Sequence, residues 1–366
     1  MSKWQTFYLK DLGKIVGGAT PSTNNPKNYG NKIAWITPKD LSTLQGRYIK
    51  KGSRSISRLG FKSCSCVLLP KHAILFSSRA PIGYVAIAKK RLCTNQGFKS
   101  IIPNKKIYFE FLYYLLKYHK DNISNIGGGT TFKEVSGTTL GLFEVKIPPT
   151  YYEQQKIART LSILDQKIEN NHKINELLHT LAYKIYEYYF KYKPKNAKLE
   201  QIIIENPKSS IMVKNAQKTQ DKYPFFTSGD NILSYPKAII DGRNCFLNTG
   251  GNAGIKFYVG KASYSTDTWC ICANEFSDYL YLLLSSIKTH INQSFFQGTS
   301  LKHLQKNLLK KYPIYMPSAH EIKKFNQIIM PLLTLISINT RISKKLEQIR
   351  DFLLPLLLTQ QVKPPK

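Results

Sequence analysis

The amino-acid sequence repeats itself once, and this duplication constrains the fold more than any other feature. With a shift of 168 residues, Leu164 aligns with Leu332, and with a shift of 169 the segment 129–133 (GTTFK) aligns with 298–302 (GTSLK). A period of this length is too long for a solenoid. It predicts two copies of one unit, related by a pseudo-twofold axis.

Each copy ends in a long segment whose apolar residues alternate at spacings of four and three, which is a heptad pattern. The pattern turns polar at the same place in both copies, at Asn171 and Asn175 in the first and at Asn339 and Ser343 in the second. One interpretation is a single amphipathic helix packed on each domain. We favour pairing of the two helices as an antiparallel coiled coil, because their polar positions match and buried Asn fixes helix register.

The repeat predicts four segments: a globular domain at 1–150, a long helix at 151–193, a second globular domain at 194–316 and a second long helix at 317–366. In each globular segment, short β-like runs alternate with a helix, which indicates an α+β fold. The strand-like runs are 66–69, 73–76, 84–88, 256–259 and 269–272, and the helical runs are 109–118 and 279–287. The predicted architecture is two related α+β domains separated by two long antiparallel coiled-coil helices.

The chain is strongly basic. Its 366 residues include 54 Lys and Arg against 22 Asp and Glu, a net charge of +32. Residues 1–152 carry +18 and residues 194–316 carry +7, whereas 153–193 and 317–366 carry +2 and +5. Such an excess argues against a routine metabolic enzyme and favours a polyanionic partner, either nucleic acid or an anionic membrane face.

Other features of the sequence favour nucleic acid and a cytoplasmic location. There is no apolar run of about 18 residues that would predict a membrane span, and no apolar stretch near the N-terminus that would predict export. Six cysteines without an export signal are typical of reduced thiols in the cytoplasm.

The sequence contains none of the common catalytic motifs. The sequence lacks a phosphate-binding loop, a GxGxxG turn, a GxSxG elbow and the [ND]PP[YF] tetrapeptide that grips a flipped adenine. Residues 165–167 (DQK) match a nuclease D-x-K pattern, but they lie on the first heptad helix, where a solvated charge pair is expected. The pairs Cys64/Cys66 and Cys270/Cys272 lack zinc spacing, so we expect small core residues on strands rather than a metal site.

The recognition surfaces are therefore expected in polar loops, where Ser, Thr, Asn, Gln, Lys and Arg can contact phosphates and base edges. Ordinary turns are the alternative explanation for any one of these loops. The candidate DNA-binding residues in the first domain are Lys39, Ser78, Arg79, Asn95, Gln96, Thr130, Thr131 and Lys133. Those in the second domain are Ser228, Asn248, Asn252, Thr266, Thr299, Ser300 and Lys302.

Several of these segments together resemble the DNA-specificity (S) subunit of type I restriction–modification systems, over essentially the whole chain. The resemblance rests on 17–21 (GGATP), 33–41 (IAWITPKDL), 77–83 (SSRAPIG), 94–98 (TNQGF), 148–169 with its PP, EQQKIA and DQKIE motifs, and 350–357 (RDFLLPLL). One departure is that 79–81 reads RAP where the family often has RGT.

The resemblance implies a non-catalytic subunit in which each target-recognition domain reads one half of a bipartite, asymmetric site in double-stranded DNA. The helices would space the domains and dock two methyltransferase subunits, and restriction–translocase subunits would join them. S-adenosylmethionine, ATP and Mg would then bind in those partners and no cofactor in this chain.

Two other functions are considered. A stand-alone two-domain DNA-binding or chromosome-organising protein would need only one buried stripe on each helix, whereas a scaffold needs a second, exposed apolar stripe. Extra apolar residues off the heptad positions favour the scaffold: Ile163, Ile174, Leu177, Leu181, Leu333, Leu335 and Ile342. A nuclease or methyltransferase is disfavoured by the missing motifs.

Overall fold

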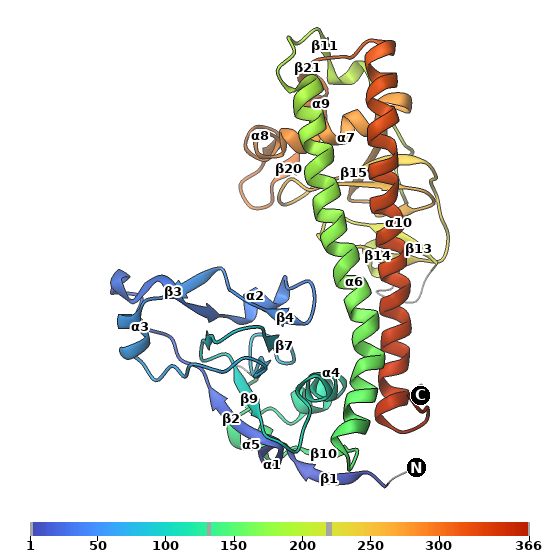
Figure 1. Ribbon diagram of the computed structural model, residues 1–366. Coiled ribbons are helices and arrows are strands. Elements are labelled where there is room, and N and C mark those ends of the chain that lie inside the picture. Colours follow the sequence, from blue (N-terminus) through green and yellow to red (C-terminus); the bar gives the residue numbers. More distant parts are fainter. Residues whose placement is uncertain (1–2, 130–132, 217–221, 365–366) are drawn as a thin grey trace. The chain divides into compact units, whose positions relative to one another are not determined.

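The computed structural model describes residues 3–129, 133–216 and 222–364 (Figure 1). The chain forms two compact units. Unit 1 consists of Met1–Glu169 and Ile349–Lys366, and unit 2 consists of Asn170–Gln348. Both long helices cross from one unit into the other. The two compact units therefore differ from the four segments expected along the sequence. The division into four segments stays a prediction.

Unit 1 is built around a five-stranded sheet and a smaller three-stranded sheet. The larger sheet has the order β2 (Gly13–Gly17), β9 (Lys99–Pro103), β6 (Ile74–Phe76), β7 (Val85–Ala88) and β4 (Tyr48–Ile49). The smaller has the order β5 (Arg54–Ile56), β3 (Tyr29–Ile36) and β8 (Cys93–Thr94), with β3 and β8 parallel. A third sheet pairs β1 (Gln5–Tyr8) with β10 (Glu144–Ile147). The helices are α1 (Leu9–Leu12), α2 (Pro38–Ser42), α3 (Arg58–Lys62), α4 (Phe109–Asn125) and α5 (Gly137–Gly141).

Unit 2 repeats most of this topology, with a larger sheet of four strands instead of five. Its larger sheet has the order β12 (Ile204–Glu205), β18 (Thr268–Cys272), β15 (Arg243–Asn248) and β16 (Ile255–Val259). Its smaller sheet has the order β14 (Leu233–Tyr235), β13 (Tyr223–Phe226) and β17 (Ser263–Tyr264), again with one parallel pair. The remaining elements are β11 (Ala197–Lys198), β19 (Phe296–Gln297), β20 (His303–Leu304), β21 (Pro313–Ile314), α7 (Ser277–Ser286), α8 (Lys288–Ser294) and α9 (Lys306–Lys310). The expected pair of related α+β domains is confirmed.

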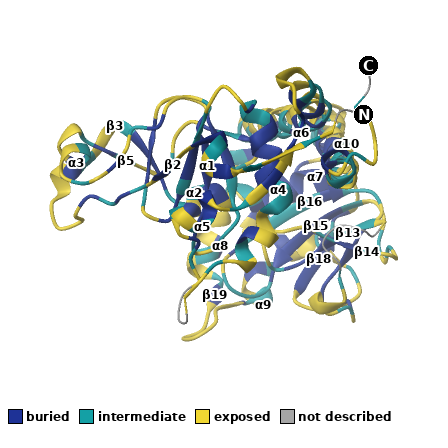
Figure 2. Ribbon diagram, turned by 90° about the horizontal axis from the view of Figure 1, so that it is seen from below, coloured by how far each residue is buried: buried dark blue, intermediate teal, exposed yellow. Residues whose placement is uncertain are grey.

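Each unit has its own core, formed where an apolar helix covers the larger sheet. In unit 1, the apolar run 111–116 of α4 is fully enclosed and packs with Ile74 and Phe76 of the central strand. In unit 2, α7 packs on β15 and β18, whose residues are mostly buried (Figure 2). Central strands bury both faces and often read as continuous apolar runs, which is why 73–76 and 269–272 could be expected from the sequence. The strand β15 was not predicted, because Arg243, Asn244 and Asn248 interrupt its apolar pattern.

The two long helices are α6 (Tyr151–Tyr186), which continues into one π-helical turn at Glu187–Lys191, and α10 (Ala319–Leu358). Both begin with the same capping arrangement. Thr150 Oγ1 accepts the amide of Glu153 at 3.2 Å, and Ser318 Oγ accepts the amide of Glu321 at 3.3 Å. A hydroxyl followed three residues later by Glu satisfies amides of the first turn, so each helix begins where the proline-containing segment before it ends.

The two helices pair in antiparallel fashion within each unit. In unit 2, Asn339 Nδ2 donates to Asn175 Oδ1 at 2.9 Å and Asn171 Nδ2 donates to Ser343 Oγ at 3.2 Å. In unit 1, Leu161 of α6 shares a core cluster with the C-terminal end of α10. The structure thus brings the four polar seam residues together, and their role in fixing register stays a prediction.

Three details differ from expectation. Residues 66–69 form no strand; only Leu69 makes an isolated bridge, to Leu92, so the Cys64/Cys66 pair lies in an irregular segment after α3. Leu333 is 1% exposed and belongs to the core of unit 2 rather than to an outer stripe. Asp165 is 4% exposed, so the expected solvated charge pair on the first helix is wrong.

Candidate nucleic-acid interface

In unit 1, three loops that follow strands β3, β6 and β8 are joined by backbone hydrogen bonds. The amide of Asn95 donates to the carbonyl of Ile36 at 2.9 Å, and the amide of Ser78 donates to the carbonyl of Gly97 at 2.8 Å. A fourth segment joins them where the amide of Val135 donates to the carbonyl of Ser78 at 3.0 Å. These contacts gather loops that are far apart in sequence into one site.

Local side-chain contacts give these loops their shape. Asn95 Oδ1 accepts the amide of Gly97 at 3.0 Å, and a Cβ on Gly97 would lie 2.9 Å from Cγ of Pro38. Asp40 caps the short helix α2 by accepting the amide and the hydroxyl of Thr37, both at 2.8 Å. Although burial opposes ionisation, hydrogen bonds from Ser53 and Thr37 lower the pKa of Asp40. These contacts hold the loops in shape while the side chains of Lys39 and Gln96 remain exposed to solvent.

The candidate residues of unit 1 fall into three groups. Lys39, Gln96 and Lys133 are exposed, and Arg79 and Asn95 are half-buried. Ser78 is fully buried, since its amide and carbonyl join two neighbouring loops, and its expected contact with DNA stays a prediction. Thr130 and Thr131 lie outside the described residues.

Unit 2 gathers the corresponding loops by corresponding bonds. The amide of Thr249 donates to Ser228 Oγ at 3.0 Å, and the hydroxyl of Thr249 donates to the carbonyl of Asp267 at 2.6 Å. The amide of Gly251 donates to the carbonyl of Lys302 at 2.9 Å. The strand ends that build this site, β13, β15 and β17, are the counterparts of β3, β6 and β8 in unit 1.

The candidate residues of unit 2 are mostly exposed. Those open to solvent are Asn252, Thr266, Thr299, Ser300 and Lys302, and Ser228 is half-buried. Asn248 is buried, because it donates to the carbonyl of Asn252 at 3.1 Å and accepts Lys256 Nζ at 2.8 Å. Asn248 shapes the loop from beneath, and its expected contact with DNA stays a prediction.

Some polar residues at these sites were missed from the sequence. In unit 1, Glu134 forms ion pairs with both Lys99 and Arg79. In unit 2, Lys256 also donates to the carbonyl of Thr227 at 2.9 Å, and burial lowers the pKa of Lys256. The one available signal was the repeat itself, in which Glu134 aligns with His303 directly beside the predicted loop residues.

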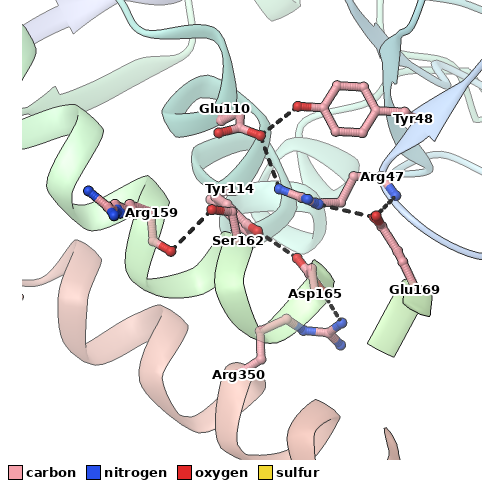
Figure 3. A network of polar contacts seen from close by, with 9 residues as sticks. All are labelled: Arg47, Tyr48, Glu110, Tyr114, Arg159, Ser162, Asp165, Glu169 and Arg350. Carbon is pink, nitrogen blue, oxygen red and sulfur yellow. Dashed lines mark hydrogen bonds and ion pairs between the residues drawn. The ribbon is translucent and has the colours of Figure 1, made fainter. Parts of the chain in front are cut away.

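Each unit attaches its sheet to the helices through an arginine, which is buried in unit 1 and half-buried in unit 2. In unit 1, Arg47 contacts Oε1 of Glu110 on α4 at 3.0 Å and Oε1 of Glu169 on α6 at 3.1 Å (Figure 3). Burial by itself disfavours the charge on Arg47, but the surrounding negative groups, including Glu169, raise the pKa of this residue. An uncompensated charge at such a site would be very costly, so the arrangement holds the sheet against α6.

In unit 2, Arg243 of β15 performs the corresponding task. It contacts Asp278 of α7 at 2.5 Å and donates to the hydroxyl of Thr334 on α10 at 2.9 Å. Asp278 and Glu110 are equivalent in the repeat and both lie at the start of the helix that covers the larger sheet. The two domains therefore share this acidic position, although Arg47 lies just before β4 and Arg243 begins β15.

Comparison with known proteins identifies the family. The model of the type I restriction modification DNA specificity domain matches residues 1–180 and 195–348. The chain belongs to this family of specificity subunits. It is 33% identical to the type I restriction enzyme MjaIX specificity subunit of Methanocaldococcus jannaschii, over 97% of this chain and 92% of that protein.

A second relative and a solved structure agree with this assignment. The HindI specificity subunit of Haemophilus influenzae is 31% identical over 46% of this chain and 37% of its own length. The crystal structure of the type I restriction–modification S subunit from M. genitalium is similar in fold, with a TM-score of 0.64 at 17% identity, covering 98% of this chain and 96% of that one.

The long helices of this specificity subunit carry exposed apolar residues in addition to their packed seam. On α6 within unit 2, Ile174, Leu177 and Leu181 are exposed, and Leu177 is 69% accessible. On α10, Leu335 and Ile342 are exposed seven residues apart, with Ile328 one heptad earlier. Ile163 of α6 is likewise exposed in unit 1. With the exception of Leu333, the expected outer apolar residues are confirmed, and we call the set in unit 2 the outer stripes.

Within the described part of the specificity subunit, no group of three or more His, Cys, Asp or Glu side chains is placed to hold a metal ion. All six cysteines are free thiols. Among the described helices, none combines the length and the apolar character that crossing a membrane requires.

Proposed function

We propose that this specificity subunit reads a bipartite, asymmetric site in double-stranded DNA, with one half read by each unit. The observation that supports this most strongly is the duplicated loop site, built at the same strand ends of the same topology in both units. The side chains differ between the two sites. Unit 1 offers Lys39, Arg79, Gln96 and Lys133, whereas unit 2 offers mainly hydroxyl and amide groups with Lys302. Different donors and acceptors select different bases, so the two half-sites should differ in sequence.

The charge distribution supports DNA as the partner. The excess of basic residues is largest in 1–152 and 194–316, the segments that contain the loop sites. Phosphate contacts from Lys and Arg position a protein on the duplex, and contacts to base edges supply the specificity.

We further propose that the outer stripes dock two methyltransferase subunits, and that restriction–translocase subunits join the complex. Exposed apolar residues at heptad spacing are typical of a helix surface that is covered by a partner. S-adenosylmethionine, ATP and Mg would bind in those partners in the cytoplasm, and this chain would contribute recognition without a catalytic step. A stand-alone DNA-binding protein would leave the outer stripes without a purpose.

Methylation mapping tests this proposal. DNA from cells that express this chain with its candidate methyltransferase should carry methylated adenines or cytosines within one bipartite motif. Replacing residues 1–150 by those of another specificity subunit should change only one half of that motif. Changes in both halves, or methylation without sequence preference, would contradict the proposal.

The same assay tests whether the helices set the spacing. Four residues inserted near Asn171 lengthen α6 by about 6 Å at ~1.5 Å per residue. This length is close to two base pairs at ~3.4 Å each. The expected result is a longer non-specific spacer between unchanged half-sites. An unchanged spacer would show that the helices do not measure the distance.

A further inference from the structure

We infer that Arg79 and Glu134 form a base-reading pair, in which Arg79 recognises a guanine of the half-site bound by unit 1 and Glu134 positions the guanidinium. This inference rests on the proposed function. It names two residues of the loop site and the base that they select.

Three charged side chains, those of Arg79, Glu134 and Lys99, lie together at the loop site of unit 1. Arg79 Nη1 lies 3.5 Å from Oε2 of Glu134, and Lys99 Nζ lies 3.1 Å from Oε1 of the same carboxylate. Lys99 is mostly enclosed on strand β9, whereas Arg79 and Glu134 are 38% and 35% exposed. Glu134 is thus anchored on the inner side by Lys99 and presents its second oxygen to Arg79.

Backbone hydrogen bonds hold both Arg79 and Glu134 in place. The amide of Glu134 donates to the carbonyl of Gly128 at 2.9 Å, and the next amide, that of Val135, donates to the carbonyl of Ser78 at 3.0 Å. Arg79 follows Ser78 directly. Backbone hydrogen bonds therefore fix the main chain from which the two side chains extend. This reduces the conformational freedom that Arg79 loses on binding DNA.

Arginine has enough hydrogen-bond donors to contact Glu134 and a base at the same time. A guanidinium carries five N–H donors in a fixed plane, so Arg79 can remain in contact with Glu134 through Nη1 while other donors meet a base edge. The bidentate contact of Arg with O6 and N7 of guanine is the most common specific contact in the major groove.

Unit 2 differs from unit 1 at the position of Arg79. The amide of Leu304 donates to the carbonyl of Thr249 at 3.0 Å, as the amide of Val135 donates to the carbonyl of Ser78, so Gly250 and His303 stand in the positions of Arg79 and Glu134. Glycine has no side chain to reach a base. The pair is therefore particular to unit 1. Its removal should affect one base pair in one half-site only.

The test is selection of bound duplexes from a randomised library by the full chain, in complex with its methyltransferase where that is needed for affinity. The variant Arg79→Ala should reduce discrimination at one G·C position by about 5- to 150-fold, and the other half-site should be unchanged. The variant Glu134→Gln should weaken the preference at the same position without lowering total affinity, and Glu134→Asp should restore part of it. Thermal unfolding of each variant confirms that the fold is retained.

Matched controls separate this role from simple charge effects. Arg159→Ala removes one exposed guanidinium from α6, and Glu200→Gln removes one exposed carboxylate in unit 2; neither should alter any base preference. If Glu134→Gln raises affinity for all duplexes equally and keeps the preference, Glu134 only offsets charge and the inference is overturned. It is also overturned if wild type shows a bipartite preference in which no position responds to Arg79→Ala. A wild-type complex without any sequence preference would overturn the proposed function itself.

Discussion

Asp165 on α6 and Arg350 on α10 form a buried ion pair in unit 1, with Oδ1 of Asp165 2.7 Å from Nη1 of Arg350. The other carboxylate oxygen accepts the hydroxyl of Tyr114 at 2.6 Å. Burial, reinforced by the charge of Asp165, raises the pKa of Tyr114, so the hydroxyl stays a donor. The carboxylate of Asp165 thus joins three helices of unit 1: α4, which covers the larger sheet, and the two long helices α6 and α10.

This geometry predicts that Asp165→Ala destabilises unit 1 by about 3–5 kcal/mol, because it removes the buried carboxylate that pairs with Arg350 and accepts the hydroxyl of Tyr114. Denaturant unfolding of the full chain measures the change. Arg350 also contacts Asp351, which is half exposed, and Asp351→Ala should cost no more than about 1 kcal/mol. Equal costs for the two variants would mean that burial does not decide the strength of this pair.

The Asn175–Asn339 hydrogen bond predicts non-additive effects in unit 2. Asn175→Leu alone should destabilise the chain by about 1–3 kcal/mol, since it leaves the amide of Asn339 buried and unpaired. The double variant Asn175→Leu, Asn339→Leu should recover that loss because the seam becomes apolar, but should pair with less defined register. Thermal unfolding measures the first effect, and a mixture of spacer lengths in methylation maps would reveal the second. Additive losses in the double variant would argue against a direct coupling.

The outer stripes predict a separation of binding from stability. Leu177→Glu should change the free energy of unfolding by less than about 0.5 kcal/mol, because the side chain is exposed, and should abolish co-elution with the methyltransferase. The adjacent Leu178 packs against the core of unit 2, so Leu178→Glu should instead destabilise the fold. Unchanged methyltransferase binding by the Leu177 variant would place the docking surface elsewhere.

The cap of α10 predicts a pH dependence. Hydrogen bonds from Ser318 and Tyr315 lower the pKa of Glu321 to about 2, from an ordinary value of 4.5. The folded-state pKa is depressed, so the charged carboxylate contributes stability that is complete above about pH 4.5 and is lost as pH falls toward 2. Melting temperatures of Glu321→Gln should therefore fall less steeply than wild type over this range. Glu200→Gln serves as a control, and an identical profile for wild type and Glu321→Gln would contradict the assignment.

The basic loop sites predict a strong dependence of DNA affinity on salt. If about 6–10 phosphates are contacted, affinity should fall by about 10³- to 10⁵-fold between 50 and 200 mM salt. Fluorescence anisotropy with a duplex that contains the mapped site measures this slope. A flat response would exclude phosphate contacts as a main source of affinity.

The sequence predicted the large-scale features of this fold because they are periodic. The duplicated unit, the long helices and the matching polar positions at Asn175 and Asn339 all depend on regular spacing, which a single sequence displays. Strands with buried faces, such as 74–76, could be expected because both faces are apolar.

Burial of individual polar residues could not be predicted in the same way. Ser78 and Asn248 lie in segments rich in polar residues, yet both are buried. Ser78 is enclosed by Gly97 and Val135, which are distant in sequence, and Asn248 by the fold of its own loop around Asn252 and Lys256. Asp165 is surrounded by Tyr114 and Arg350, which lie 51 and 185 residues away. Local composition carries no information about such partners, and for the same reason Glu134 was not expected at the loop site.

The participation of α10 in unit 1 has a consequence for synthesis on the ribosome. Leu354, Leu357 and Leu358 belong to the same buried cluster as Leu161 and as Leu9 and Leu12 of α1. These leucines are translated after the whole of unit 2, which is continuous from 170 to 348. The domain that emerges first therefore completes its core last, and a nascent or prematurely terminated chain exposes an unfinished apolar surface on its N-terminal domain.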